Sequence, residues 1–173
     1  MRSSDDLVCV NAAANGHLHC LQYAHEQGAS WQALIVIRAA EVGQLQCLRY
    51  ALEHDCPRHQ DACYSAARNG RFGALLVLRH HGLVWDIRTS AEAATRADEN
   101  CLQLLHEDGC PWDRCTIENA ALCGKVKTLR YAMHNGCPHH YAVMTYAVQG
   151  GNLECVQYLV EERRLPLNIA VFI

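Results

Sequence analysis

The sequence predicts an all-α fold, a solenoid of helix-turn-helix repeats, and three observations carry this prediction. Alanine lies at one column in six copies of a repeat, and leucine or valine lies nine residues later in each copy. Between these two columns, a small residue that we call the turn glycine recurs every 27 residues. It occurs at Gly16, Gly43, Gly70, Ala97, Gly124 and Gly151. A fixed period of this kind is typical of repeat architectures, in which each copy is one small supersecondary unit.

The period divides the chain into six units. A lead-in at residues 1–6 precedes an array at 7–168, and residues 169–173 begin a truncated seventh unit. The units are 7–33, 34–60, 61–87, 88–114, 115–141 and 142–168. Because one such unit is too small to bury its own apolar face, we expect stacked neighbours to share a continuous core.

Each unit is expected to contain two short helices around the turn glycine. In residues 34–42 and 115–123, apolar or small residues lie seven, four and three positions before this glycine, on one side of a helix. In residues 18–27, apolar residues lie two, four, five and eight positions after it, which predicts a second amphipathic helix. A glycine twelve positions after the turn suits the left-handed residue that ends this helix.

Some units depart from the pattern. Asp55 and Arg163 occupy helix-ending sites that are otherwise held by glycine, Ala97 replaces a turn glycine, and polar Glu99 takes an apolar position. These sites are either weak points or bends of the stack. At Asp55 we expect left-handed strain of about 1 kcal/mol.

Composition excludes several classes of protein. The net charge is −3, only two lysines occur, and no run of basic residues is present, so we expect no nucleic-acid partner and no membrane-surface partner. The first ten residues, MRSSDDLVCV, have no apolar stretch of signal-peptide length, and no segment approaches a membrane span. We therefore expect an intracellular, cytoplasmic protein.

The eleven cysteines follow the repeat. One column holds Cys20, Cys47, Cys101 and Cys155, and another holds Cys56, Cys110 and Cys137. Adjacent helix axes lie about 8–10 Å apart, whereas a disulfide needs Cα atoms within about 7 Å. The columns therefore favour small buried apolar residues over disulfides.

Metal and catalytic chemistry lack their usual motifs. The stretches CPHH at 137–140 and HEDGC at 106–110 come nearest to a zinc site, but no Cys-x-x-Cys pair accompanies them, and a structural zinc needs four convergent ligands. No phosphate-binding loop, nucleophile elbow or His-Glu-x-x-His motif occurs. We expect no metal, no cofactor and no enzymatic activity.

The repeat resembles the ankyrin family. AANGHLHCLQY at 13–23 and GGNLECVQYLVEE at 150–162 are similar to the second half of an ankyrin unit. The likeness is closer to divergent ankyrin-type arrays of protists and large DNA viruses, whose copies end in GCPWD. This chain has GCPWD at 109–113 and GLVWD at 82–86, and the resemblance covers residues 7–168.

An ordinary ankyrin unit is longer than this one. It has about 33 residues, and the deficit falls where the family has its projecting β-hairpin finger. We therefore expect the fingers to be shortened to turns, with about twelve short helices and almost no sheet. Trp31, Trp85 and Trp112 share one column in this region. They either pack the turn onto the next unit or form an exposed aromatic strip.

The resemblance implies a monomeric protein-protein interaction scaffold. With short fingers, binding would fall to the concave face of the first helices, at positions that vary in charge and size between copies. The candidate partner-binding residues are Arg38, Glu41, Ser65, Arg68, Glu92, Arg96, Asn119, Leu122, Tyr146 and Gln149. A merely solvated face would show the same variation.

A second hypothesis assigns the array a structural role. It would then be a spacer within a larger protein, for example in the substrate-binding part of a ubiquitin-ligase adaptor. The final residues LNIAVFI favour this alternative, because a solenoid normally ends in a polar capping repeat.

Overall fold

The computed structural model describes residues 4–96 and 99–165. Within these ranges it contains twelve α-helices, one π-helix and no strand, which confirms the predicted all-α repeat fold. Ala97 and residues 166–173, which include the predicted start of a seventh unit, lie outside the described residues, as does the side chain of Glu99. Among the described helices, none has the length and apolar character needed to cross a bilayer.

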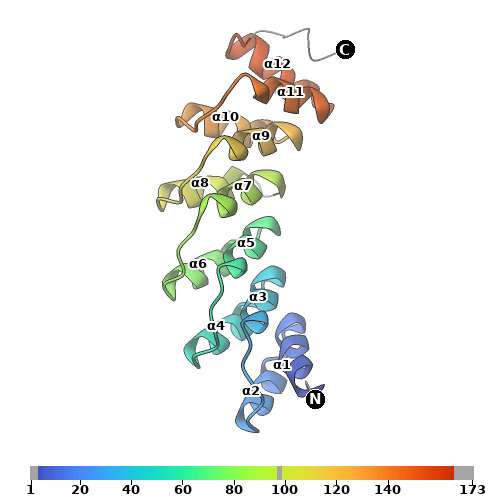
Figure 1. Ribbon diagram of the computed structural model, residues 1–173, viewed down its shortest axis with the longest axis vertical. Coiled ribbons are helices and arrows are strands. Elements are labelled where there is room, and N and C mark those ends of the chain that lie inside the picture. The colour runs from blue at the N-terminus through green and yellow to red at the C-terminus, as the bar shows by residue number, and fades with distance from the viewer. Residues whose placement is uncertain (1–3, 97–98, 166–173) are drawn as a thin grey trace. The chain divides into compact units, whose positions relative to one another are not determined.

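The described part of the first compact half, residues 4–85, consists of three helical hairpins. The first helices of the hairpins are α1 (Ser4–Asn15), α3 (Ala33–Val42) and α5 (Asp61–Arg68). The second helices are α2 (Leu18–Glu26), α4 (Leu45–Glu53) and α6 (Phe72–His80). Because α3 packs against α1 and α5, and α4 packs against α2 and α6, this half has two helical layers (Figure 1).

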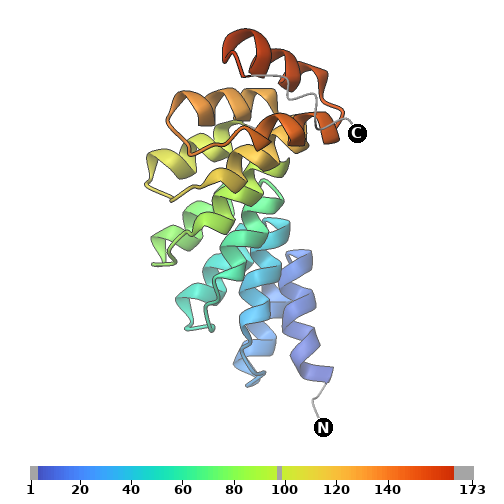
Figure 2. The same cartoon turned by 45° about the horizontal axis from the view of Figure 1, so that its top comes forward.

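The described part of the second compact half, residues 86–96 and 99–165, is built in the same way. Its first helices are α7 (Ile87–Arg96), α9 (Arg114–Leu122) and α11 (Ala142–Gln149). Its second helices are α8 (Glu99–Glu107), α10 (Val126–His134) and α12 (Leu153–Gln157), and α12 continues into the π-helix η1 (Tyr158–Glu162). The helix α9 packs between α7 and α11, and α10 packs against α8 and α12 (Figure 2).

The alanine column lies where the first helices meet. Ala39 and Ala40 of α3 and Ala66 and Ala67 of α5 are completely buried. Side chains of this size let neighbouring helices approach closely. The invariant alanine is therefore a packing residue, as the sequence pattern predicts.

The turn glycine is required by conformation and by space. Gly124 has φ 69°, in the left-handed region. The side chain of Asn152, one unit further along, lies against it and donates from Nδ2 to the carbonyl oxygens of Ala121 and Leu122, at 3.0 and 2.8 Å. A Cβ at Gly124 would collide with this amide. The same arrangement recurs at Gly43, where a Cβ would lie 3.0 Å from Cδ of Arg71.

The aspartate that ends the GCPWD and GLVWD stretches caps the first helix of the following unit. Asp113 accepts the backbone N–H of Cys115 at 2.9 Å, and Asp86 accepts the N–H of Thr89 at 3.1 Å. These carboxylates satisfy amides that have no partner within the helix. Burial by itself would raise the pKa of Asp86, but hydrogen bonds from Arg88 and Thr89 outweigh it and lower that pKa.

The cysteine that follows the helix-ending glycine ties adjacent turns together. Cys56 Sγ donates to the carbonyl of Gln32 at 3.4 Å, and Cys137 Sγ donates to that of Asp113 at 3.3 Å. Burial raises the pKa of both thiols to about 12, so that they remain protonated donors at neutral pH. The column therefore combines apolar packing with a weak hydrogen bond.

The two residues that stand in place of a helix-ending glycine, Asp55 and Arg163, differ in conformation. Asp55 has φ 58°, which confirms the expected left-handed conformation. Arg163 has φ −98°, and the left-handed residue is Arg164 with φ 53°, so the expected position is wrong by one residue. The π-helix is the cause, because its wider turn takes up one extra residue before the helix ends.

Replacing Arg164 with glycine is expected to raise the free energy of unfolding by about 1 kcal/mol, because glycine adopts positive φ without steric cost. Asp55→Gly is expected to stabilise the protein for the same reason. Arg163→Gly is the matched control, and here glycine should only destabilise, through the greater freedom of the unfolded chain. Urea denaturation followed by circular dichroism measures all three. Stabilisation by Arg163→Gly alone would contradict the one-residue shift.

Gly124→Ala is expected to lower the free energy of unfolding by about 2–3 kcal/mol, through left-handed strain and loss of the Asn152 hydrogen bonds. Gly136→Ala is the control, since Gly136 also has positive φ but no described atom lies within 4 Å of an added Cβ. Gly136→Ala should lower the free energy of unfolding by only about 1 kcal/mol. Equal losses in thermal denaturation would show that Asn152 does not fix the turn.

Candidate protein-binding surface

The first half places four of the predicted binding residues on the first-helix layer. Arg38 and Arg68 are exposed, and Glu41 and Ser65 are half-buried. Arg38 and Glu41 form an ion pair at 2.7 Å, one turn apart on α3. Because the pair is largely in solvent, it can exchange for contacts with a partner at little cost in stability.

A groove of about 380 Å³ brings Arg38 and Glu41 together with residues of the neighbouring units. It runs between α1 and α3 and reaches the turn after α5. The lining residues are Leu7, Val10, Asn11 and Ala14, then Leu34, Arg38, Glu41 and Val42, and finally Asn69 and Arg71. The groove is thus shared by three consecutive units within one compact half.

The second half places the other six candidates on α7, α9 and α11. Arg96, Leu122 and Gln149 are exposed, whereas Glu92, Asn119 and Tyr146 are half-buried. Asn119 Nδ2 donates to the carbonyl of Ala91 at 3.0 Å, so part of its amide already holds adjacent first helices together. The residues five positions before the turn glycine are therefore partly structural here, and those nearer the turn are more accessible.

The sequence pattern missed several residues of the groove. Leu7, Leu34 and Val42 are 60, 41 and 41% exposed, although all three are apolar. Arg71 also lines the groove and donates from Nε to the carbonyl of Glu41 at 3.4 Å. Leu7 and Leu34 share one column, nine residues before the turn glycine, and their common apolar character was an available signal.

The tryptophans pack the turns. Trp85 is 3% exposed, and the guanidinium of Arg79 lies 5.1 Å from its ring centre. Trp112 stacks on His106 with ring centres 3.9 Å apart, and His106 Nδ1 lies 2.9 Å from the hydroxyl of Tyr131 in the next unit. The packing interpretation is thus confirmed, and the strip is not an exposed aromatic surface.

The arrangement of Trp112 has a counterpart in the first half. Trp31 contacts His25, with ring centres 4.2 Å apart, and His25 Nδ1 lies 3.0 Å from the hydroxyl of Tyr50. In both places a histidine at the end of one second helix bonds to a tyrosine of the following one. These histidines join consecutive units, which accounts for their position in the repeat.

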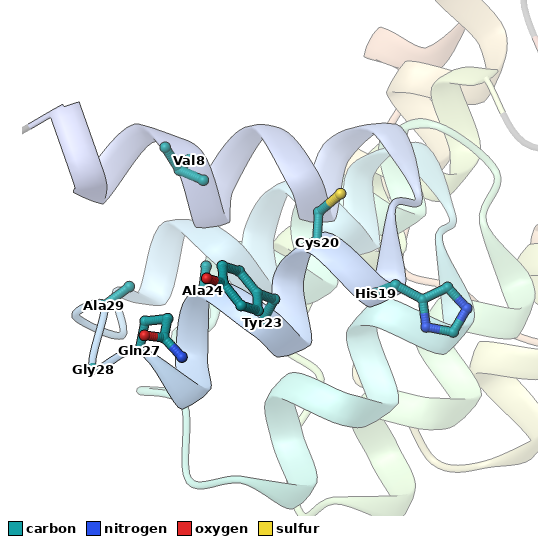
Figure 3. Close-up of a pocket in the computed structure, with 8 residues that line it drawn as sticks. All are labelled: Val8, His19, Cys20, Tyr23, Ala24, Gln27, Gly28 and Ala29. Carbon is teal, nitrogen blue, oxygen red and sulfur yellow. The ribbon is translucent and has the colours of Figure 1, made fainter.

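A pocket of about 650 Å³ lies on the first unit and includes Val8, Cys20 and Tyr23 (Figure 3). In the second unit, the columns of Val8 and Cys20 hold Ile35 and Cys47, which are buried where α3 and α4 meet the preceding helices. The pocket therefore has the composition of a repeat-stacking face. Its lining follows from the core pattern of the array and indicates no separate ligand chemistry.

The histidine and cysteine stretches hold structural contacts. His106 bonds to Tyr131, and Cys110 Sγ donates to the carbonyl of Asp86 at 3.5 Å. Among the described side chains, those of residues 7–96 and 100–165, no three His, Cys, Asp or Glu residues are grouped so that they could share a metal ion.

Comparison with known proteins identifies the fold. No family model and no curated protein matches the sequence. The structure is similar to the crystal structure of the human ASB11 ankyrin repeat domain, with a TM-score of 0.73 and 17% sequence identity over 92% of this chain and 83% of that chain. The chain therefore has the ankyrin-repeat fold.

Thiol labelling is expected to separate the cysteines by burial. In the native protein, iodoacetamide should modify the exposed Cys20 and Cys123 first, whereas Cys56 and Cys137 should react only after unfolding in urea. Mass spectrometry of tryptic peptides measures each site. Labelling of Cys56 as fast as Cys20 in the native protein would contradict its burial and its hydrogen bond.

Proposed function

We propose that this protein is a monomeric, intracellular protein-binding module whose partner contacts the exposed side of the first helices. The observation that carries the proposal is the groove in the first half, where an exposed ion pair lies beside exposed apolar side chains. Exposed apolar surface rimmed by polar residues marks interaction sites in many soluble proteins. The reducing interior of a cell suits a chain with eight buried cysteines, several of which act as thiol donors.

The mechanism is the rigid display of variable side chains. The alanine column and the turn hydrogen bonds hold each first helix in place, whereas the residues just before the turn glycine differ from unit to unit. A surface that is ordered before binding loses little conformational entropy when a partner arrives. Sequence can therefore change at the surface while the framework stays constant.

The competing proposal is that the array is a spacer within a larger protein. A module of this kind could also be the substrate-binding part of a ubiquitin-ligase adaptor, which is one setting for the binding function proposed here. The groove favours binding over a purely structural role, because a spacer has no need for apolar side chains held in solvent.

Charge reversal on the first-helix surface tests the proposal. Arg38→Glu combined with Arg68→Glu is expected to abolish most capture of a partner from an extract of the source cells, since arginine is enriched among interface anchors. The helical signal should be unchanged, and the free energy of unfolding should fall by no more than about 1 kcal/mol, because exposed helix pairs such as Arg38 and Glu41 contribute little.

The matched control reverses two exposed cations of the second helices, Arg49→Glu with Lys127→Glu. Arg130 is unsuitable, because it pairs with Glu162 at 2.5 Å and lies over the ring of Tyr158. Capture should survive in this control. Equal loss in both variants, or no capture by the unmodified protein, would refute the first-helix surface and favour the spacer.

A further inference from the structure

Two arginines line the groove between α1 and α3. Arg38 lies on α3, and Arg71 lies at the turn end of the groove, after α5. Among the described residues that line the groove, Glu41 is the one acidic side chain. The lining therefore has two arginines and one glutamate, although the whole chain has a net charge of −3.

Arg38 and Arg71 each bond to Glu41 through one part of the guanidinium group. Arg38 uses Nη1 to bond Glu41, and Arg71 uses Nε to bond the carbonyl of the same residue. A guanidinium has five N–H donors in a planar fork, so each arginine retains the geometry to bind a carboxylate. The bond from Nε also holds the Arg71 side chain across Gly43, which places its charged end before a ligand binds.

Apolar side chains occupy the other part of the groove. Leu7 and Leu34 lie near the beginnings of α1 and α3, and Val10 and Ala14 of α1 also line the groove. Leu7 and Leu34 are 60 and 41% exposed in the described structure. Covering them would release water from apolar surface, at about 25 cal/mol for each Å² buried.

We infer that this groove binds a protein segment that combines acidic residues with a bulky aliphatic or aromatic side chain. The carboxylates pair with Arg38 and Arg71 near the turn end, and the apolar side chain covers Leu34 and Leu7. The inference rests on the proposed function and specifies the chemistry of the partner at the first half of the array. The corresponding positions of the second half include Glu92, Asn119 and Gln149, which do not share this positive balance.

Selection from a display library of random peptides tests the inference with the complete protein. Peptides of about 12 residues span roughly 40 Å when extended, enough to follow a helix-length groove. The selected peptides should be enriched in Asp and Glu together with Leu, Ile or Phe. Recovery of basic or uncharged peptides, or of no peptide, would overturn the inference.

Variants of the protein then show where the selected peptide binds. Arg38→Gln with Arg71→Gln should weaken binding of an enriched acidic peptide about tenfold in a fluorescence titration, and Leu34→Ser should weaken it independently. Glutamine fits at position 71 because Gln44 occupies the same column in the preceding unit. Arg49→Gln with Lys127→Gln is the charge-matched control and should leave the affinity unchanged.

The outcomes separate this inference from the proposed function. If Arg38 and Arg68 are needed to capture a cellular partner but the selected peptides are not acidic, the binding function stands and the partner chemistry is wrong. If acidic peptides bind equally well to all variants, their site lies elsewhere and the inference fails. Circular dichroism of each variant ensures that a loss of affinity does not arise from unfolding.

Discussion

Close contact between first helices is the constraint on which the rest of the structure depends. A unit of 27 residues has no interior of its own, so it becomes stable only when neighbours cover its apolar side. The paired alanines, such as Ala39 with Ala40 and Ala66 with Ala67, permit that contact and are completely buried. A larger side chain in this column would force neighbouring helices apart, and the cost would fall on both units at once. This explains why alanine recurs six times while the surrounding surface varies.

The turns complete the framework with few residues. In the GCPWD stretch, Gly109 adopts the left-handed conformation, Cys110 bonds to the preceding turn, Trp112 stacks on His106, and Asp113 begins α9. These contacts hold consecutive units together at a position where longer ankyrin repeats have a projecting hairpin. The tyrosine and histidine of adjacent second helices add a further bond between units. The side chains of the turns are therefore committed to packing.

Much of this framework could be predicted from the sequence, because a repeat displays each structural requirement several times. The alanine column, the helix order and the left-handed Asp55 follow from comparing copies. The shift from Arg163 to Arg164 could not be predicted, because it depends on a π-helix that occurs in one unit only. Two residues that line the groove, Arg38 and Glu41, are among the candidate partner-binding residues, and their role in binding stays a prediction. Arg71 was missed, because its column lies in the turn, and only the folded chain carries that side chain back over the preceding unit.

Arg71 both stabilises a turn and lines the groove. The residue just before each turn glycine is exposed in all six units and has no constant chemistry, so it can change without altering the core. The residue just after the turn glycine is different. At this position Asn152 bonds the end of α9 and so stabilises the turn. Arg71 bonds the carbonyl of Glu41 and also lines the groove. A change of charge at this column therefore alters the groove while the side chain continues to hold the turn, provided that the new residue keeps a donor for the preceding helix end.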